Sequence, residues 1–392
     1  MVQGARHRPE GSGVPQRRST AADRPRGNEA RDGGARVNAQ QPKTAPAANA
    51  PKELGKPLVP TTQINRIRFS PDGKMLVAAC FDGTVKRWDV SGKEPIELPA
   101  ITGHNGWVTS LAFAGTALFS VDSWGRLTAT DLSAKESKKL WSVEAAHDGW
   151  LRGVAVSPNG ERLITGGKDG FARLWNTADG KQIGDFEAKA DVLSVCYSPG
   201  GKSVFVGDLF GVVRELHTVP GKPVRTFEAK ELHKLDRIQD VGGVKNLLIS
   251  GDGKTLFAAG AEPKSGGFVQ CVPLIVAFDL ATGKRLSTYK GANDNEGYVT
   301  DMAWHPDGYV IGTTSGQPGQ GKLFCWKPGE AAPFFSGGKL PNCHSVALHP
   351  KGEIVAVSAT NANSSGNGRV KGMGGDYPAN TSPIQLWTVP KA

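Results

Sequence analysis

The segment TVKRWD (84–89) is the first of seven short runs that decide the fold of this chain, and FARLWN (171–176) and PIQLWT (383–388) are two others. Each run closes on a characteristic pair of residues. The seven pairs are Trp88-Asp89, Thr130-Asp131, Trp175-Asn176, Leu216-His217, Phe278-Asp279, Trp326-Lys327 and Trp387-Thr388. Successive pairs are separated by 42, 45, 41, 62, 48 and 61 residues.

A repeat of roughly 40–45 residues, built from short strands, is typical of one blade of a β-propeller. Seven pairs therefore predict an all-β, seven-bladed propeller of four-stranded antiparallel blades. Pro-Gly and Asp-Gly turns recur at matching places in the repeats, for example SPDG (70–73) and SPNG (157–160). Such residues supply the fixed and positive φ angles of tight turns. The second repeat has only Ala-Gly-Thr (114–116) at this place, so its first hairpin should be tighter.

The ends of the chain predict how the ring closes. Too few residues follow Trp387 to form a fourth strand, yet GKPLVPTT (55–62) resembles fourth strands such as GKPVRTFEA (221–229). We therefore expect residues 55–61 to complete the last blade beside 383–389. Residues 1–51 are rich in Arg, Gly, Pro and Ala, so we expect them to be a disordered tail before a single propeller at 52–392.

The net charge of +10 is not concentrated in the repeats. Residues 1–51 hold 9 of the 47 Lys and Arg and 4 of the 37 Asp and Glu, which leaves 38 basic and 33 acidic residues. A nucleic-acid interface would show a clustered basic face. Nucleic acid is therefore not the expected partner, although an Arg-rich tail that binds it with steep salt dependence remains an alternative.

Composition also bears on the cellular compartment. The five cysteines are too few and too scattered for a disulfide framework, and no apolar run approaches 18 residues. We expect a cytoplasmic protein with no membrane association. ARVNAQQPKTAPAANAP (35–51) resembles the spacer after a cleaved signal, so an export signal lost through a wrongly assigned start is the alternative.

Residue by residue, positions 52–392 resemble the WD-repeat (WD40) propeller family. The divergent repeats resemble those of a bacterial-type member. In that family a His, a Ser or Thr, a turn Asp and the Trp form a buried hydrogen-bonded tetrad. The third repeat matches it fully, with His147, Thr165, Asp169 and Trp175. The second repeat keeps His104 but has Trp124 in place of the turn Asp.

The long intervals indicate where a binding surface lies. The extra residues fall in second turns and in links between blades, at 228–243, 261–271, 290–298 and 360–382, all at one end of the strands. Loops on a rigid scaffold often carry function. Trp107, Trp150 and Tyr298 share one repeat position at this end, which lines the channel mouth in the family. The residues predicted to contact a partner are Trp107, Trp150, Arg152, Tyr298, Asp301, Arg237 and Tyr377.

Structural explanations stay open for each of these groups. The three aromatic rings could only cap a strand and pack on the next blade. Leu232, Leu235 and Ile238 are spaced by three, which favours a short amphipathic helix whose charges, Arg237 included, form a solvated face. The loop around Tyr377 could be mobile without a function.

No catalytic constellation is apparent. The sequence has no CxxC, HExxH, phosphate-binding Gly loop or GxSxG motif, and no cofactor or metal is expected. AFDLATGKRL (277–286) resembles the repeat of quinoprotein dehydrogenases, but it occurs once and lacks the docking Trp. The sequence predicts a non-catalytic scaffold, a monomeric propeller within a complex, that docks a protein or peptide on its loop-rich face. A propeller enzyme or small-ligand binder of the quinoprotein type is the alternative.

Overall fold

The computed structural model describes residues 50–390, apart from 219–222, 265–269, 318 and 362–380. All of these residues belong to one compact unit, Pro42–Ala392. The expected disordered tail lies outside the described residues, except for its last two positions.

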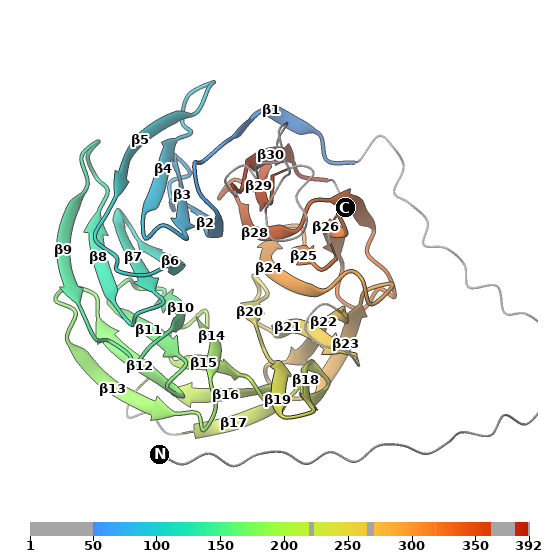
Figure 1. Ribbon diagram of the computed structural model, residues 1–392. Helices are drawn as coiled ribbons and strands as arrows, with labels where there is room; N and C mark the ends of the chain where they lie inside the picture. The colour runs from blue at the N-terminus through green and yellow to red at the C-terminus, as the bar shows by residue number, and fades with distance from the viewer. Residues whose placement is uncertain (1–49, 219–222, 265–269, 318, 362–380, 391–392) are drawn as a thin grey trace, which may run out of the picture. The chain divides into compact units, whose positions relative to one another are not determined.

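Seven four-stranded antiparallel sheets are arranged around a centre, as predicted (Figure 1). The strands of each blade are given from the centre outward. Blade 1 consists of β2 (Ile64–Phe69), β3 (Met75–Cys80), β4 (Val85–Asp89) and β5 (Ile96–Ile101), and blade 2 of β6 (Val108–Ala114), β7 (Ala117–Asp122), β8 (Leu127–Asp131) and β9 (Lys138–Val143). Blade 3 consists of β10 (Leu151–Val156), β11 (Arg162–Gly167), β12 (Phe171–Asn176) and β13 (Gln182–Glu187).

The remaining blades follow the same order. They are β14 (Val192–Tyr197), β15 (Ser203–Asp208), β16 (Val212–His217) and β17 (Pro223–Glu228); β20 (Asn246–Ile249), β21 (Thr255–Pro263), β22 (Cys271–Asp279) and β23 (Arg285–Lys290); β24 (Tyr298–His305), β25 (Tyr309–Ser315), β26 (Gly321–Trp326) and β27 (Phe335–Leu340); and β28 (Cys343–Leu348), β29 (Ile354–Ala359), β30 (Ile384–Thr388) and β1 (Glu53–Leu58).

The repeated pair marks the end of the third strand in every blade. β4 ends at Asp89, β12 at Asn176 and β30 at Thr388, and only β26 ends one residue earlier, at Trp326. Apolar side chains from neighbouring blades pack against each other, so that Ile164 and Leu174 of blade 3 share a core with Val192 and Val206 of blade 4. Burial between blades, rather than within one sheet, therefore holds the ring together.

The ring closes as the sequence predicted. β1, from the start of the described chain, pairs antiparallel with β30, and Glu53 lies opposite Trp387. The amide of Lys52 donates to Thr388 Oγ1 at 2.9 Å, and the amide of Thr388 donates to the Lys52 carbonyl at 2.8 Å. The edge of β30 is therefore covered by a strand from the other end of the chain, which removes an exposed sheet edge.

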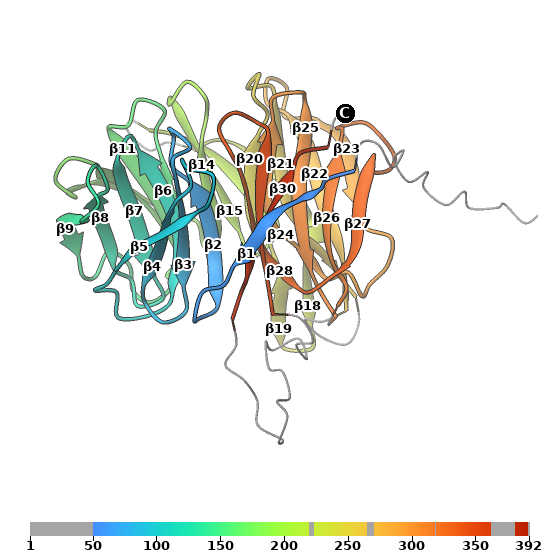
Figure 2. The same ribbon diagram turned by 90° about the horizontal axis from the view of Figure 1, so that it is seen from above.

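The expected helix between blades 4 and 5 was wrong. A single 3₁₀ turn, η2 (Lys230–Leu232), leads into a β-hairpin of β18 (His233–Asp236) and β19 (Gln239–Gly242). The hairpin lies at the lower edge of the propeller in Figure 2, the edge where β1 leads into β2. Of the three apolar residues, Leu232 in η2 is buried, while Leu235 and Ile238 in the hairpin are exposed.

Candidate functional site

The face formed by the second turns and the links between blades carries a cluster of aromatic side chains. The rings of Trp107 and Trp150 meet edge to face, with centroids 5.3 Å apart. Phe81, from the second turn of blade 1, packs against Trp107 at 4.8 Å. Contacts of this geometry fix the rings relative to one another. The predicted positions 107 and 150 are thus brought together, and Trp107 remains 43% exposed.

Trp124 lies beside the residue that precedes Trp107, although its sequence position suggested only a lost turn aspartate. Its indole lies on Gly106, where a Cβ atom would come within 2.5 Å of Trp124 Cδ1. The Trp124 side chain is 68% exposed. Further round the face, Phe210 in the second turn of blade 4 is 41% exposed and contacts His233 of the hairpin. Ile238 at the hairpin tip is 93% exposed.

Arg152 and Tyr298 lie deeper, toward the channel. The Arg152 guanidinium carbon is 4.6 Å from the centroid of the Trp150 ring. Tyr298 is only partly exposed, and the Lys245 ammonium lies 5.0 Å from the centroid of its ring. Trp150 and Tyr298 therefore each have a cation over the ring, Arg152 and Lys245 respectively.

Asp301 is buried in an ion-pair network that joins three blades. Its carboxylate pairs with Arg66 at 2.7 Å and with Arg68 at 2.8 Å, both on β2. It also accepts hydrogen bonds from the Ser345 hydroxyl and, at 3.2 Å, from the Val346 amide on β28. Only 3% of the Asp301 side chain is exposed. This residue is positioned to hold blades 1, 6 and 7 together across the channel.

The charges around Asp301 decide its protonation. Burial alone would raise its pKa, because a buried carboxylate loses hydration. The guanidinium groups of Arg66 and Arg68 outweigh that loss, so the pKa of Asp301 is held below its ordinary value. Asp301 is therefore a carboxylate at neutral pH.

The four tetrad positions of blade 3 are joined by hydrogen bonds. His147 Nδ1 lies 2.9 Å from Asp169, and His147 Nε2 lies 2.8 Å from Thr165 Oγ1. The indole N–H of Trp175 donates to the same Thr165 hydroxyl at 2.8 Å. Burial lowers the pKa of His147 to about 4, although Asp169 opposes that shift. A neutral His147 that donates to Asp169 and accepts from Thr165 satisfies all of these contacts.

Blade 2 builds a related network with an aspartate that the sequence analysis missed. Asp122, at the end of β7 and fully buried, lies 3.0 Å from His104 Nδ1. The Asp122 carboxylate also accepts hydrogen bonds from the backbone amides of Trp124 and Arg126 in the second turn. Asp208 stands at the same place in blade 4 and pairs with Arg214. The aspartate has moved two residues back, from the turn to the strand, which releases Trp124 to point outward.

A buried acidic residue also fixes the link between blades 5 and 6. Glu296 is 1% exposed and accepts a hydrogen bond from Lys322 Nζ of β26 at 2.6 Å. Its carboxylate also receives the Ala292 amide and the Asn293 side-chain amide. The link that ends at Tyr298 is therefore rigidly held.

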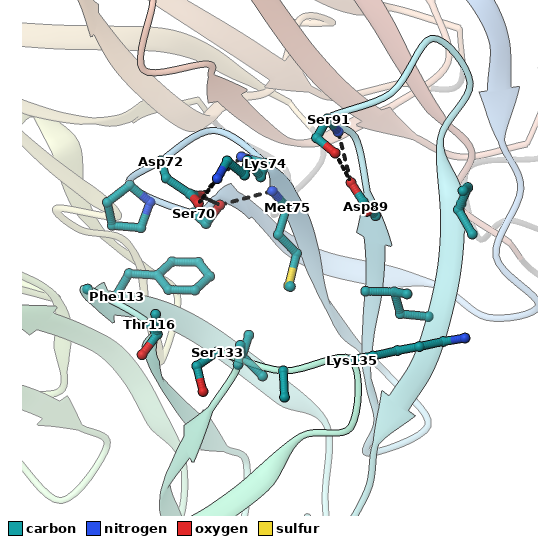
Figure 3. A pocket seen from close by; sticks show the side chains of 16 residues that line it. Ser70, Asp72, Lys74, Met75, Asp89, Ser91, Phe113, Thr116, Ser133 and Lys135 are labelled. Carbon is teal, nitrogen blue, oxygen red and sulfur yellow. Dashed lines mark hydrogen bonds and ion pairs between the residues drawn. The ribbon is translucent and has the colours of Figure 1, made fainter.

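A cavity of about 670 Å³ lies at the opposite end of the strands, between blades 1 and 2. Figure 3 shows that first and third turns line it. Its carboxylates are occupied by the turns themselves: Asp72 accepts from the Ser70 hydroxyl and the Lys74 amide, and Asp89 accepts from Ser91. These groups stabilise turns and do not converge on a ligand.

The structure also places the quinoprotein-like stretch and Arg237. Asp279 and Thr282 of the quinoprotein-like stretch form a turn, because Asp279 accepts both the amide and the hydroxyl of Thr282. Arg237 lies at the tip of the β18–β19 hairpin, and Tyr377 lies outside the described residues.

Among the described residues no group of three or more His, Cys, Asp or Glu side chains is arranged to hold a metal ion. The described part of the chain also contains no helix of the length and apolarity needed to cross a membrane.

Three stretches, residues 56–89, 138–176 and 283–327, match the family described as WD domain, G-beta repeat (WD40). The chain thus contains WD40 repeats and folds as a seven-bladed propeller of four-stranded blades. It is similar to RACK1y, a small ribosomal subunit protein of Oryza sativa subsp. japonica, with 31% identity over 106 residues. It is also similar to the nuclear distribution protein PAC1 of Arthroderma benhamiae, with 32% identity over 115 residues.

These matches are partial on both sides. The RACK1y match covers 24% of this chain and 29% of the relative, and the PAC1 match covers 27% and 24%. The chain thus matches less than a third of the length of either relative.

Proposed function

We propose that this propeller is a non-catalytic scaffold that binds a protein or peptide partner on the face of second turns and links. Trp107, Trp124 and Trp150 form the centre of the contact, with Arg152 and Tyr298 at the channel mouth. The hairpin with Arg237 extends the same face. Rigid blades hold these groups in fixed positions, which reduces the ordering cost of association.

The exposure of Trp107 and Trp124 carries this proposal. The two indoles are 43% and 68% exposed and lie on neighbouring backbone, next to the half-buried Trp150. A Trp residue that only packs between blades is covered, as Trp175 is at 3%. Trp, Tyr and Arg are enriched among residues that contribute most to protein interfaces. The relatives add support, since RACK1y is by name a protein of the small ribosomal subunit, which is a multi-component assembly.

The test compares the double variant Trp107→Ala/Trp124→Ala with the wild type. Affinity purification from the native host with mass spectrometry would identify partners, and purified partner would then be titrated directly. We expect the double variant to bind at least about 30-fold more weakly, because each interface hot spot contributes about 2 kcal/mol or more.

The matched control is Leu140→Ala/Ile183→Ala. These side chains are 48% and 49% exposed, but they lie on the outer strands β9 and β13. The control should bind like the wild type. A folded Trp107→Ala/Trp124→Ala variant that keeps every partner at unchanged affinity would refute this choice of face.

A further inference from the structure

The central channel holds a cavity of about 330 Å³, lined by the innermost strands of blades 1 to 6. Many times the space that one water needs is available there. The charged side chains of its lining are Arg66, Arg68, Arg152, Lys245 and Asp301. Four cations thus face one carboxylate, whereas the chain outside residues 1–51 is almost balanced in charge.

The single carboxylate is fully used on one side of the channel. Asp301 pairs with Arg66 and Arg68, and Arg66 also donates to Asn246 Oδ1 at 3.3 Å. Even so, Arg66 Nε is buried with no hydrogen-bond partner among the described residues. This network therefore contains no further carboxylate that could pair with the other two cations of the lining, Arg152 and Lys245.

Arg152 and Lys245 have no carboxylate partner within ion-pair distance among the described residues. Arg152 stacks on Trp150, Lys245 lies over the Tyr298 ring, and Arg152 Nε is buried without a hydrogen-bond partner. Burial lowers the pKa of the Arg152 guanidinium, and the charge of Asp191 opposes this shift. Burial, and then the charge of Arg152, lower the pKa of the Lys245 ammonium. The two cations therefore repel each other in a partly dehydrated space.

We propose that Arg152 and Lys245 form an anion site in the channel that binds a phosphate-type oxyanion. A guanidinium presents two parallel N–H donors that match two oxygens of a phosphate, and an ammonium adds a point charge beside it. The anion would satisfy the buried Arg152 Nε and remove the repulsion between the cations. The site stands independently of protein docking on the outer face, because a free ion can enter it without a partner.

The probe is inorganic phosphate, titrated by calorimetry against sodium chloride of equal ionic strength. A phosphoserine hexapeptide forms a second arm: tighter binding than phosphate indicates a phosphorylated protein segment, and equal binding indicates the free ion. We expect saturable phosphate binding to the wild type. Arg152→Gln and Lys245→Gln should each weaken it about tenfold or more, as expected for lost charge-assisted hydrogen bonds.

Lys74→Gln is the matched control, because Lys74 is exposed on the opposite face. It should bind phosphate like the wild type. A second readout needs no channel variant: the Arg152 Nε–H resonance of the wild type should shift with phosphate and not with chloride. Absence of phosphate-specific binding and of this shift would overturn the site, as would unchanged affinity in a folded Arg152→Gln/Lys245→Gln variant.

Discussion

Arg68 of blade 1 and Asp301 of blade 6 form an ion pair across the channel, 2.8 Å between Nη1 and Oδ2, although 233 residues separate them in sequence. Blade 7 lies between them in the ring and joins the same carboxylate through Ser345. One buried acidic side chain therefore ties the first repeat to the last two.

Asp301→Asn is expected to lower the free energy of unfolding by about 3–5 kcal/mol, because it leaves two arginines without their charge partner in a buried setting. Urea denaturation measures the change. The control is Asp72→Asn, whose exposed pair with Lys74 spans 3.8 Å. It should cost about 1 kcal/mol or less. Equal costs for the two variants would show that the network contributes no more than a surface pair.

Acidification should destabilise the protein through His147. Its pKa is about 4 in the folded state and about 6.5 in the unfolded chain, so the unfolded state binds more protons between these values. Stability is therefore complete above pH 6.5 and falls as pH drops toward 4, by up to about 3 kcal/mol for this residue.

The check is denaturation across pH 4–7 for the wild type and His147→Gln. The variant should be less stable at pH 7 but show a shallower pH slope. Burial also lowers the pKa of His344 to about 4, so His344→Gln should reduce the slope in the same way. An unchanged slope in both variants would contradict neutral burial of these histidines.

Removal of β1 should open the ring. Deleting residues 50–62 exposes the edge of β30 and removes the hydrogen bonds at Thr388, so we expect unfolding or aggregation. Size-exclusion chromatography and thermal melting measure the outcome. A variant that begins at Ala48 keeps β1 and is the control. Unchanged melting after the deletion would mean that β1 contributes nothing to closure.

Arg237→Gly should stabilise the β18–β19 hairpin. Arg237 is the first of two turn residues between Asp236 and Gln239, and its φ is +59°. Glycine is favoured at this place in a two-residue hairpin turn. A left-handed residue other than glycine costs about 1–2 kcal/mol. Hydrogen exchange of the hairpin amides should slow by about fivefold or more, while amides of β10 and β11 stay unchanged. Faster exchange would show that the Arg237 side chain holds the hairpin.

The fold could be read from the sequence because its signals are local and repeated. The pair at the end of each third strand and the turns between strands predicted seven blades, and the fourth-strand pattern at 55–62 predicted closure by β1. The hairpin at 233–242 was missed because Leu232, Leu235 and Ile238 fit a helical spacing as well. No local pattern records that β18 pairs with β19.

The site was less accessible to sequence reasoning. Trp107 and Trp150 could be found because they share a repeat position. Trp124 was missed because it stands where the turn aspartate was expected, and the aspartate that accepts its amide, Asp122, lies two residues earlier in the sequence. The pairs of Asp301 with Arg66 and Arg68 depend on how the ring brings β2 and β24 to one channel. Such contacts follow from closure and leave no spacing in the sequence.

Closure by β1 also has a consequence for the order of assembly. During synthesis, residues 53–58 and the arginines of β2 leave the ribosome well before their partners at Asp301 and in β30. Contacts over such long separations form slowly, because the intervening chain must be ordered first. The arginines of β2 and the pairing edge of β1 therefore remain without their native partners until most of the propeller has been synthesised. Closure of the ring therefore pairs two strands that are synthesised far apart in time, β1 and β30.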